Sequence, residues 1–429
     1  MDDNGKYYSP EIWLERSKGA PLYIRVLQPR FTLDDEYMAE EEEESWAPAF
    51  PGSERVPAPM VNRLMNFLSP LMPQVCSLTT VLSWPYESTL ELLLDCWKLH
   101  GTPGQAKVLK TLSNMGLAHI TIRSPESYTP FLESLEVLHL HNTILSWSNF
   151  LFHNLTVFET SVGEGQWTIA LFELAGILSS CPKLQRLSLD GLMIEPFLAP
   201  QPKSILLRDL QQLQITGFSN IQQMDGAAML ESVLAMIIPG QHALDVEISL
   251  SYISKSSQRA IDAVRTFVER ANVIKLYVRG YQTSRIWNNV YFATQLGPLP
   301  RVQTLILEEW GFSDIAEFEE VYLDPVTCDN LRPINPEVIL WPDVRKLYLH
   351  RCFLEKAHLR HLISLQSIQT LYLKQCYDGY QSRRPFDVGT QSSTEYVQLL
   401  SQVVPKVVHF PAWSVPWSSI IQSDMSVMF

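Results

Sequence analysis

The stretch LEVLHLHNT at residues 135–143 decides the fold, because it recurs along the chain with leucine or a close substitute at its fourth and sixth places. Successive side chains of an extended chain point to opposite faces, so this alternation predicts a strand with one buried face. Fainter copies start at Leu117, Phe152 and Asp245. Six further clear copies are LQRLSLDGL from Leu184, LQQLQITGF from Leu210, VIKLYVRGY from Val273, VQTLILEEW from Val302, VRKLYLHRC from Val344 and IQTLYLKQC from Ile368.

A single copy of this repeat phrase cannot cover its own apolar row, so the copies are expected to stack as an array. Several intervals match the roughly 20–29 residues of a leucine-rich repeat, and others are longer. Helical spacing occurs between phrases, most clearly after Ser256 and Ser257, at Ala260, Ile261, Val264, Phe267, Val268 and Ala271. The sequence therefore predicts an α/β, leucine-rich-repeat-like solenoid: an irregular horseshoe with parallel strands on its concave face and helices outside.

Place nine of the phrase is where a leucine-rich repeat carries an inward Asn or Cys. Only the last two clear copies match, with Cys352 and Cys376, and the others carry Thr143, Leu192, Phe218, Tyr281 and Trp310. The missing asparagines indicate a divergent repeat.

Composition excludes several classes of protein. With 46% hydrophobic residues among 429, the chain can bury a large core. No secretion signal and no apolar run near the ~20 residues of a membrane span occurs, so we expect an intracellular protein, cytoplasmic or nuclear, that does not enter membranes. The net charge of −13 disfavours nucleic-acid binding. The six cysteines contain no Cys-x-x-Cys pair and are interpreted as free buried thiols.

Four regions are expected along the chain. Residues 1–30 read as a helix that Ser9 caps and Gly19 ends, followed by a strand from Pro21 to Leu27, the whole segment packing on the first repeat. Residues 31–60 form an acidic, proline-rich and flexible loop. Residues 61–405 hold the solenoid, and residues 406–429 are a C-terminal cap or a loose tail.

EIWLERSKGAPLYIRV, from Glu11 to Val26, resembles the segment that follows the F-box in large fungal F-box proteins. CPKLQRLSLDGL, from Cys181, resembles the repeat phrase of F-box leucine-rich-repeat proteins. In that family the F-box joins the repeats to the adaptor and cullin of a ubiquitin ligase, and the repeats choose the substrate. Only ten residues precede Glu11, so the F-box is expected to be absent. An incomplete gene model and a real loss of the module are both open.

Local signatures of catalysis are missing. The chain has no phosphate-binding Gly-x-x-x-x-Gly-Lys loop, no Gly-x-Ser-x-Gly elbow and no His-Glu-x-x-His helix. His139 and His141 share a strand face, and His358 and His361 lie one helical turn apart, but we interpret all four as solvent-facing and not as metal ligands. We therefore expect no enzyme, no cofactor and no metal.

Places three, five and seven of the phrase point to the concave face, where a partner would meet the array. In the C-terminal copies places five and seven are rich in Tyr and in charge, and Tyr and Arg are common binding hot spots. Tyr also suits any half-buried strand, so a purely structural role stays open. The hypothetical partner-binding strip consists of Tyr277, Arg279, Glu308, Tyr348, His350, Tyr372 and Lys374.

The sequence thus predicts a non-catalytic protein-interaction domain that resembles the substrate-recognition region of an F-box leucine-rich-repeat ligase receptor. Its protein target is unknown, and a ubiquitin-ligase adaptor joins the expected partners only if an F-box lies upstream. The alternative is a free-standing repeat scaffold or decoy with no link to ubiquitin.

Overall fold

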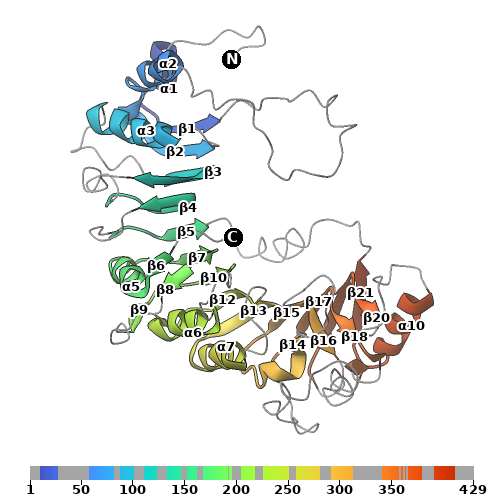
Figure 1. The fold of residues 1–429 in the computed structure, drawn as a ribbon. Coiled ribbons are helices and arrows are strands. Elements are labelled where there is room, and N and C mark those ends of the chain that lie inside the picture. Colours follow the sequence, from blue (N-terminus) through green and yellow to red (C-terminus); the bar gives the residue numbers. More distant parts are fainter. Residues whose placement is uncertain are drawn as a thin grey trace, which may run out of the picture. The chain divides into compact units, whose positions relative to one another are not determined.

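The computed structural model describes residues 10–27, 58–81, 87–100, 111–122, 133–145, 152–161, 168–191, 193–195, 204–217, 226–250, 258–280, 291–312, 341–356, 359–360, 363, 366–378 and 391–410 (Figure 1). The chain divides into two compact units, Met1–Leu192 and Met193–Phe429. Both units are built on parallel strands with helices between them, so the predicted α/β class is confirmed. No helix among the described residues is long and apolar enough to cross a membrane.

The N-terminal unit is a parallel sheet whose strands follow one another in chain order. The strands are β1 (Leu22–Leu27), β2 (Val75–Val81), β3 (Thr111–Ile122), β4 (Val137–Leu145), β5 (Val157–Ser161) and β7 (Arg186–Asp190). Its other elements are α1 (Pro10–Ser17), α2 (Ala58–Leu68), η2 (Met72–Gln74), α3 (Glu87–His100), β6 (Thr168–Ala170) and α5 (Leu171–Ser179).

The predicted helix–strand unit near the N-terminus is confirmed. Helix α1 starts at Pro10, and Gly19 follows its end with a φ of 81°, a left-handed value that glycine adopts without strain. Strand β1 then pairs in parallel with β2, with Ile24 opposite Leu78. This segment is the first strand of the sheet of the N-terminal unit.

The C-terminal unit has a main parallel sheet in chain order and a second row of short parallel strands, β14-β16-β18-β20. Figure 1 shows α6, α7 and the short strands on one side of the main strands. The main strands are β10 (Gln212–Thr216), β12 (Leu244–Ser249), β13 (Val273–Arg279), β15 (Thr304–Glu308), β17 (Lys346–His350), β19 (Thr370–Lys374) and β21 (Lys406–Phe410). The other elements are β8 (Met193–Glu195), β9 (Ile205–Leu207), α6 (Gly226–Met236), β11 (Ile237–Pro239), α7 (Gln258–Arg270), β14 (Tyr291–Phe292), η6 (Ala293–Leu296), β16 (Trp310–Phe312), β18 (Phe353–Leu354), β20 (Tyr377–Asp378) and α10 (Gln391–Leu400).

The core lies where the alternation predicts it. Leu276 and Val278, at places four and six of one phrase, are fully buried, and they pair in register with Leu305 and Leu307 of the next. The predicted apolar face of α7 is also buried. Burial of one strand row and one helix face against each other is the main stabilising term of such a layered domain.

A short second strand follows the main strand in the C-terminal copies, which the sequence analysis did not predict. The residue between the two strands, at place eight, has a left-handed backbone, with φ values of 65° at Glu309, 51° at Arg351 and 51° at Gln375. The place-eight N–H bonds across to the next phrase, as from Glu309 to the carbonyl of His350 at 2.9 Å. Place eight is therefore a repeated turn that starts the second row of strands.

The registers predicted for the three fainter copies are wrong. Leu112 pairs with Leu138, Phe158 pairs with Leu187, and Val246 pairs with Leu213. These copies therefore start at Leu109, Leu155 and Ala243, instead of Leu117, Phe152 and Asp245. In the first two of these copies place six holds a polar residue, Asn114 or Thr160. The leucine pattern therefore fits a neighbouring pair of apolar residues better than the true places four and six.

Two predicted boundaries also shift. Helix α2 starts at Ala58, inside the expected loop 31–60, and the acidic run itself lies outside the described residues. Strand β21 continues the main sheet beyond residue 405, with Val407 opposite Leu371. Residues 404–410 are thus a further copy of the phrase, and the C-terminal region begins with a strand of the sheet.

Candidate functional site

All seven residues of the predicted strip lie on one face of the main sheet in the C-terminal unit. Places four and six face the core, so places five and seven face the opposite way. Pairing in register aligns Tyr277, Ile306, Tyr348 and Tyr372 in one row and Arg279, Glu308, His350 and Lys374 in the next.

The place-five row contains a pair of stacked aromatic rings. Tyr348 and Tyr372 stack with centroids 4.1 Å apart and planes 7° from parallel. Phe410, which lies opposite Lys374 in the place-seven row, also stacks on Tyr372, with centroids 6.1 Å apart. Ile306 and Tyr277 pack against the same cluster. Phe410 was missed because the copy starting at Val404 was not recognised, although VPKVVHF carries the strand alternation. Stacked rings present a large and rigid apolar surface.

Glu308 is the centre of the place-seven row. Its Oε2 accepts a hydrogen bond from the Tyr277 hydroxyl, and its Oε1 lies 3.3 Å from Nδ1 of His350 and 3.8 Å from Nε of Arg279. Burial raises the pKa of this carboxyl, but the hydrogen bonds and the nearby positive charges lower it by a larger amount. The pKa of Glu308 therefore lies below its ordinary value. Glu308 is therefore ionised at neutral pH.

A second carboxylate, Glu309, enters the site from place eight and was missed by the sequence analysis. Its side chain is buried, and its Oε1 lies 3.6 Å from guanidinium nitrogens of both Arg279 and Arg351. Burial raises the pKa of Glu309, and the neighbouring Glu308 charge adds to this effect. The signal available in the sequence was glycine at place eight of other copies, such as Gly191 and Gly217, which marks a turn where the place-eight residue leaves the strand alternation.

The strip is less accessible than the repeat pattern predicted. Tyr348, Glu308, His350 and Lys374 are buried, with at most 7% of their surface exposed, whereas Tyr277, Arg279 and Tyr372 are half-buried. Large side chains aligned on parallel strands about 4.8 Å apart cover one another. A partner on this face would touch the tyrosine edges and the two guanidinium groups, Arg279 and Arg351, while the buried charges hold those groups in place.

Place nine carries a repeated hydrogen bond beneath the site. The indole Nε1 of Trp310 donates to the carbonyl of Val278 at 3.0 Å, and the thiols of Cys352 and Cys376 donate to Leu307 and Leu349, each at 3.3 Å. In every case the acceptor is place six of the preceding phrase. Trp310 thus performs the task of the inward Asn or Cys, so the absence of asparagine does not remove the donor.

The cysteines at place nine are poor nucleophiles. Burial raises the pKa of the Cys376 thiol to about 12, and it raises the pKa of Cys352 as well. All cysteines in the described part of the chain are free and buried, as expected.

His139 and His141 lie on the strand face away from the buried Leu138 and Leu140, and they are partly exposed instead of fully solvent-facing. Both are half-buried; Nδ1 of His139 lies 2.5 Å from Glu159, and His141 contacts the Ser161 hydroxyl. The hydrogen bond with His139 lowers the pKa of Glu159. His358 and His361 lie outside the described residues, and in the described ranges no group of three His, Cys, Asp or Glu residues could hold a metal.

No protein-family model matches this sequence, and no curated protein matches it at a significant level.

Proposed function

We propose that the chain is a non-catalytic protein-binding domain whose partner docks on the exposed face of the main sheet in the C-terminal unit. The observation that carries the proposal is the pair of aligned rows on that face. Stacked tyrosines lie beside half-exposed arginines, and Tyr and Arg contribute most to protein interfaces because of their rigid area and forked hydrogen bonding.

We further propose that the architecture is a leucine-rich-repeat-like solenoid. Three features support it: the phrase is paired in parallel and in register, a short second strand follows the turn at place eight, and place nine donates to the preceding copy. Such arrays present one strand face as an extended binding surface.

The resemblance of residues 11–26 and 181–192 to F-box leucine-rich-repeat proteins suggests the biological setting. In this proposal the repeats choose a protein for ubiquitination, as in that family. The alternative is a scaffold or decoy that binds its partner without a ligase.

The test is affinity capture with the tagged full chain, followed by mass spectrometry of the bound proteins. Tyr277→Ala combined with Tyr372→Ala should reduce capture of the specific partner at least about tenfold, since hot-spot tyrosines each contribute about 2 kcal/mol or more. Phe172→Ala is the matched control, because Phe172 is an exposed aromatic residue of α5 outside the strip.

Recovery of ligase adaptor and cullin subunits would favour the ligase setting, and a partner captured without them would favour the scaffold. Equal loss of capture in the control, or none in the double variant, would refute the proposed surface.

A further inference from the structure

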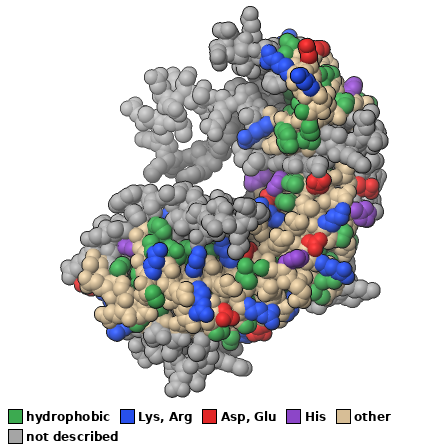
Figure 2. Space-filling model, turned by 180° about the vertical axis from the view of Figure 1, so that it is seen from behind, with side chains coloured by type: hydrophobic (Ala, Val, Ile, Leu, Met, Phe, Trp, Pro, Cys, Tyr) green, Lys and Arg blue, Asp and Glu red, His purple; other side chains and the backbone are tan. Residues whose placement is uncertain are grey.

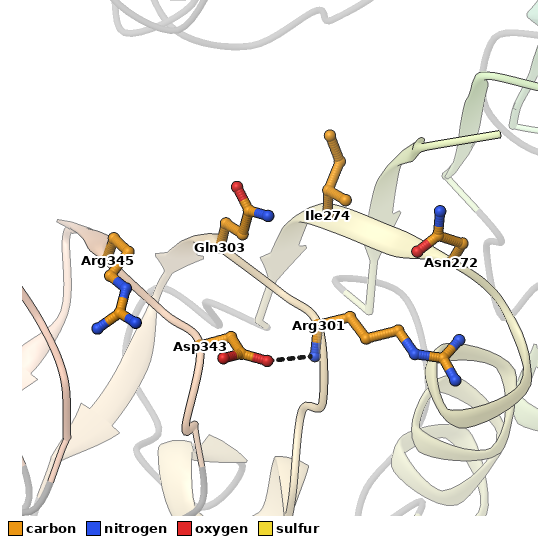
Figure 3. Close-up of a pocket in the computed structure, with 6 residues that line it drawn as sticks. All are labelled: Asn272, Ile274, Arg301, Gln303, Asp343 and Arg345. Carbon is orange, nitrogen blue, oxygen red and sulfur yellow. Dashed lines mark hydrogen bonds between the residues drawn. The ribbon is translucent and has the colours of Figure 1, made fainter.

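A cavity of about 500 Å³ opens at the edge of the C-terminal unit, where the chain enters three neighbouring strands, β13, β15 and β17 (Figure 3). Each strand contributes the residue before its phrase and the residue at place two. The lining residues are Asn272, Ile274, Arg301, Gln303, Asp343 and Arg345. They alternate with the buried residues at place one, so the repeat itself builds the cavity.

The cavity holds two arginines with no carboxylate partner among the described residues. Arg259 and Arg265 of the same unit each pair with a carboxylate, as does Lys356. Arg345, by contrast, donates only to the backbone carbonyl of Ser367 at 3.3 Å. In Figure 3 the guanidinium groups of Arg301 and Arg345 extend on opposite sides of the cavity.

No ion pair joins the Asp343 carboxylate to either guanidinium group in the described part of the chain. Its Oδ2 accepts a hydrogen bond from the backbone N–H of Arg301 at 3.3 Å, which is the dashed line in Figure 3. Arg301 has a left-handed backbone with a φ of 72°, which is costly for a residue other than glycine. The Asp343 carboxylate therefore holds the turn that aims the Arg301 side chain.

The surroundings add to the positive charge. Lys275 and Lys346 each follow a lining residue in the chain, and both pair in register with Thr304. The carboxylate of Asp245 interacts with Lys275 and offsets one of these two charges. In Figure 2 Lys and Arg side chains are more prominent than Asp and Glu on the visible face of the C-terminal unit. A cationic patch on a chain with a net charge of −13 is a local feature that selects for a negatively charged ligand.

We infer that this cavity binds an acidic, extended segment of a partner protein, with carboxylates on Arg301 and Arg345 and backbone or amide groups on Asn272 and Gln303. Arginine forms forked hydrogen bonds with carboxylates. Crossing from β13 to β17 spans roughly 10 Å, which an extended peptide covers in about three residues. The inference deepens the proposed function, on which it rests, by naming the chemistry of the partner.

The experiment measures fluorescence anisotropy of short labelled peptides added to the full-length protein. The probes are an extended peptide of alternating Glu and Ser, the same peptide with Gln for Glu, and the same peptide with Lys for Glu. The acidic peptide should bind at least about tenfold more tightly than the neutral one, and its affinity should fall between about 0.01 M and 0.15 M salt, as exposed charges are screened.

Variants locate the binding. Arg301→Ala combined with Arg345→Ala should weaken binding of the acidic peptide at least about tenfold. Asp343→Asn should strengthen it, because the amide oxygen still accepts from the Arg301 N–H while the repelling charge is gone. Arg259→Ala is the control, since Arg259 is an exposed arginine of α7 outside the cavity, and it should bind as the wild type does.

Equal binding of all peptides, preference for the lysine peptide, or unchanged binding by the double arginine variant would overturn the inference. Displacement of the acidic peptide by a single-stranded RNA at lower concentration than by unlabelled peptide would also overturn it. If the double arginine variant still captures the cellular partner while the double tyrosine variant does not, this inference fails and the proposed function stands.

Discussion

Trp310→Phe tests whether place nine holds successive copies of the phrase together. Trp310 is fully buried, and its Nε1 donates to the Val278 carbonyl of the preceding copy at 3.0 Å. Phenylalanine removes this hydrogen bond, at a cost of about 1 kcal/mol, and leaves a cavity worth about 1–3 kcal/mol. The variant should lose about 2–4 kcal/mol of stability.

Trp341→Phe is the matched control. Trp341 is equally buried, but its Nε1 has no hydrogen-bond partner among the described residues. The same cavity cost is offset by removal of a buried unsatisfied N–H, which is worth about 1–3 kcal/mol, so stability should change little.

The assay is urea denaturation followed by circular dichroism, with the transition midpoints of wild type and both variants compared. We expect a clearly lower midpoint for Trp310→Phe than for Trp341→Phe. Equal midpoints, or a larger loss for Trp341→Phe, would refute the role of the place-nine donor.

Three further predictions concern the turn, the carboxylate and the thiols. Gly280→Ala should lower the denaturation midpoint, because the new Cβ would lie 2.5 Å from the backbone oxygen of Glu309. Gly176→Ala in α5 should raise the midpoint, because its Cβ would meet nothing within 4 Å and alanine favours a helix over glycine. The reverse order of midpoints would contradict the packing at place eight. The folded-state pKa of Glu308 lies below its ordinary 4.5, so its ionised carboxylate stabilises the fold above pH 4.5, and this stabilisation is lost as the pH falls through the folded-state pKa. The denaturation midpoints of wild type and Glu308→Gln should therefore converge in acid. A gap between the midpoints that stays constant with pH would contradict this role of Glu308. Cys352 and Cys376 should resist iodoacetamide in the native protein and react after unfolding, as read by mass spectrometry; rapid native labelling would contradict their burial.

The strands with leucine at places four and six were predictable from the sequence, because alternation reports burial directly. Leu276, Val278, Leu347 and Leu349 are buried as the pattern requires. Register was lost where a polar residue such as Thr160 occupies place six, because a buried threonine gives no hydrophobic signal. The leucine pattern alone does not reveal such a copy. Its register becomes clear only from the strands that pair with it.

The candidate site was predictable in position and less so in character. Alternation put Tyr348 and Tyr372 on one face, but it says nothing of the close stacking that buries Tyr348. Glu309 was missed because alternation assigns place eight to the core face, whereas the left-handed backbone there breaks the alternation and Glu309 pairs with Arg279 and Arg351. The cavity forms because the residues that lead into β13, β15 and β17 lie side by side. This alignment depends on the register between strands, which the sequence of a single phrase does not contain.

The most direct test of the central claim is hydrogen–deuterium exchange of the full chain, alone and with its captured partner. We expect binding to slow exchange in peptides that cover β13, β15, β17 and β19, whose side chains form the proposed surface. Slower exchange confined to α6 and α7, or to the N-terminal unit, would contradict the claim that the partner docks on the strand face of the C-terminal unit.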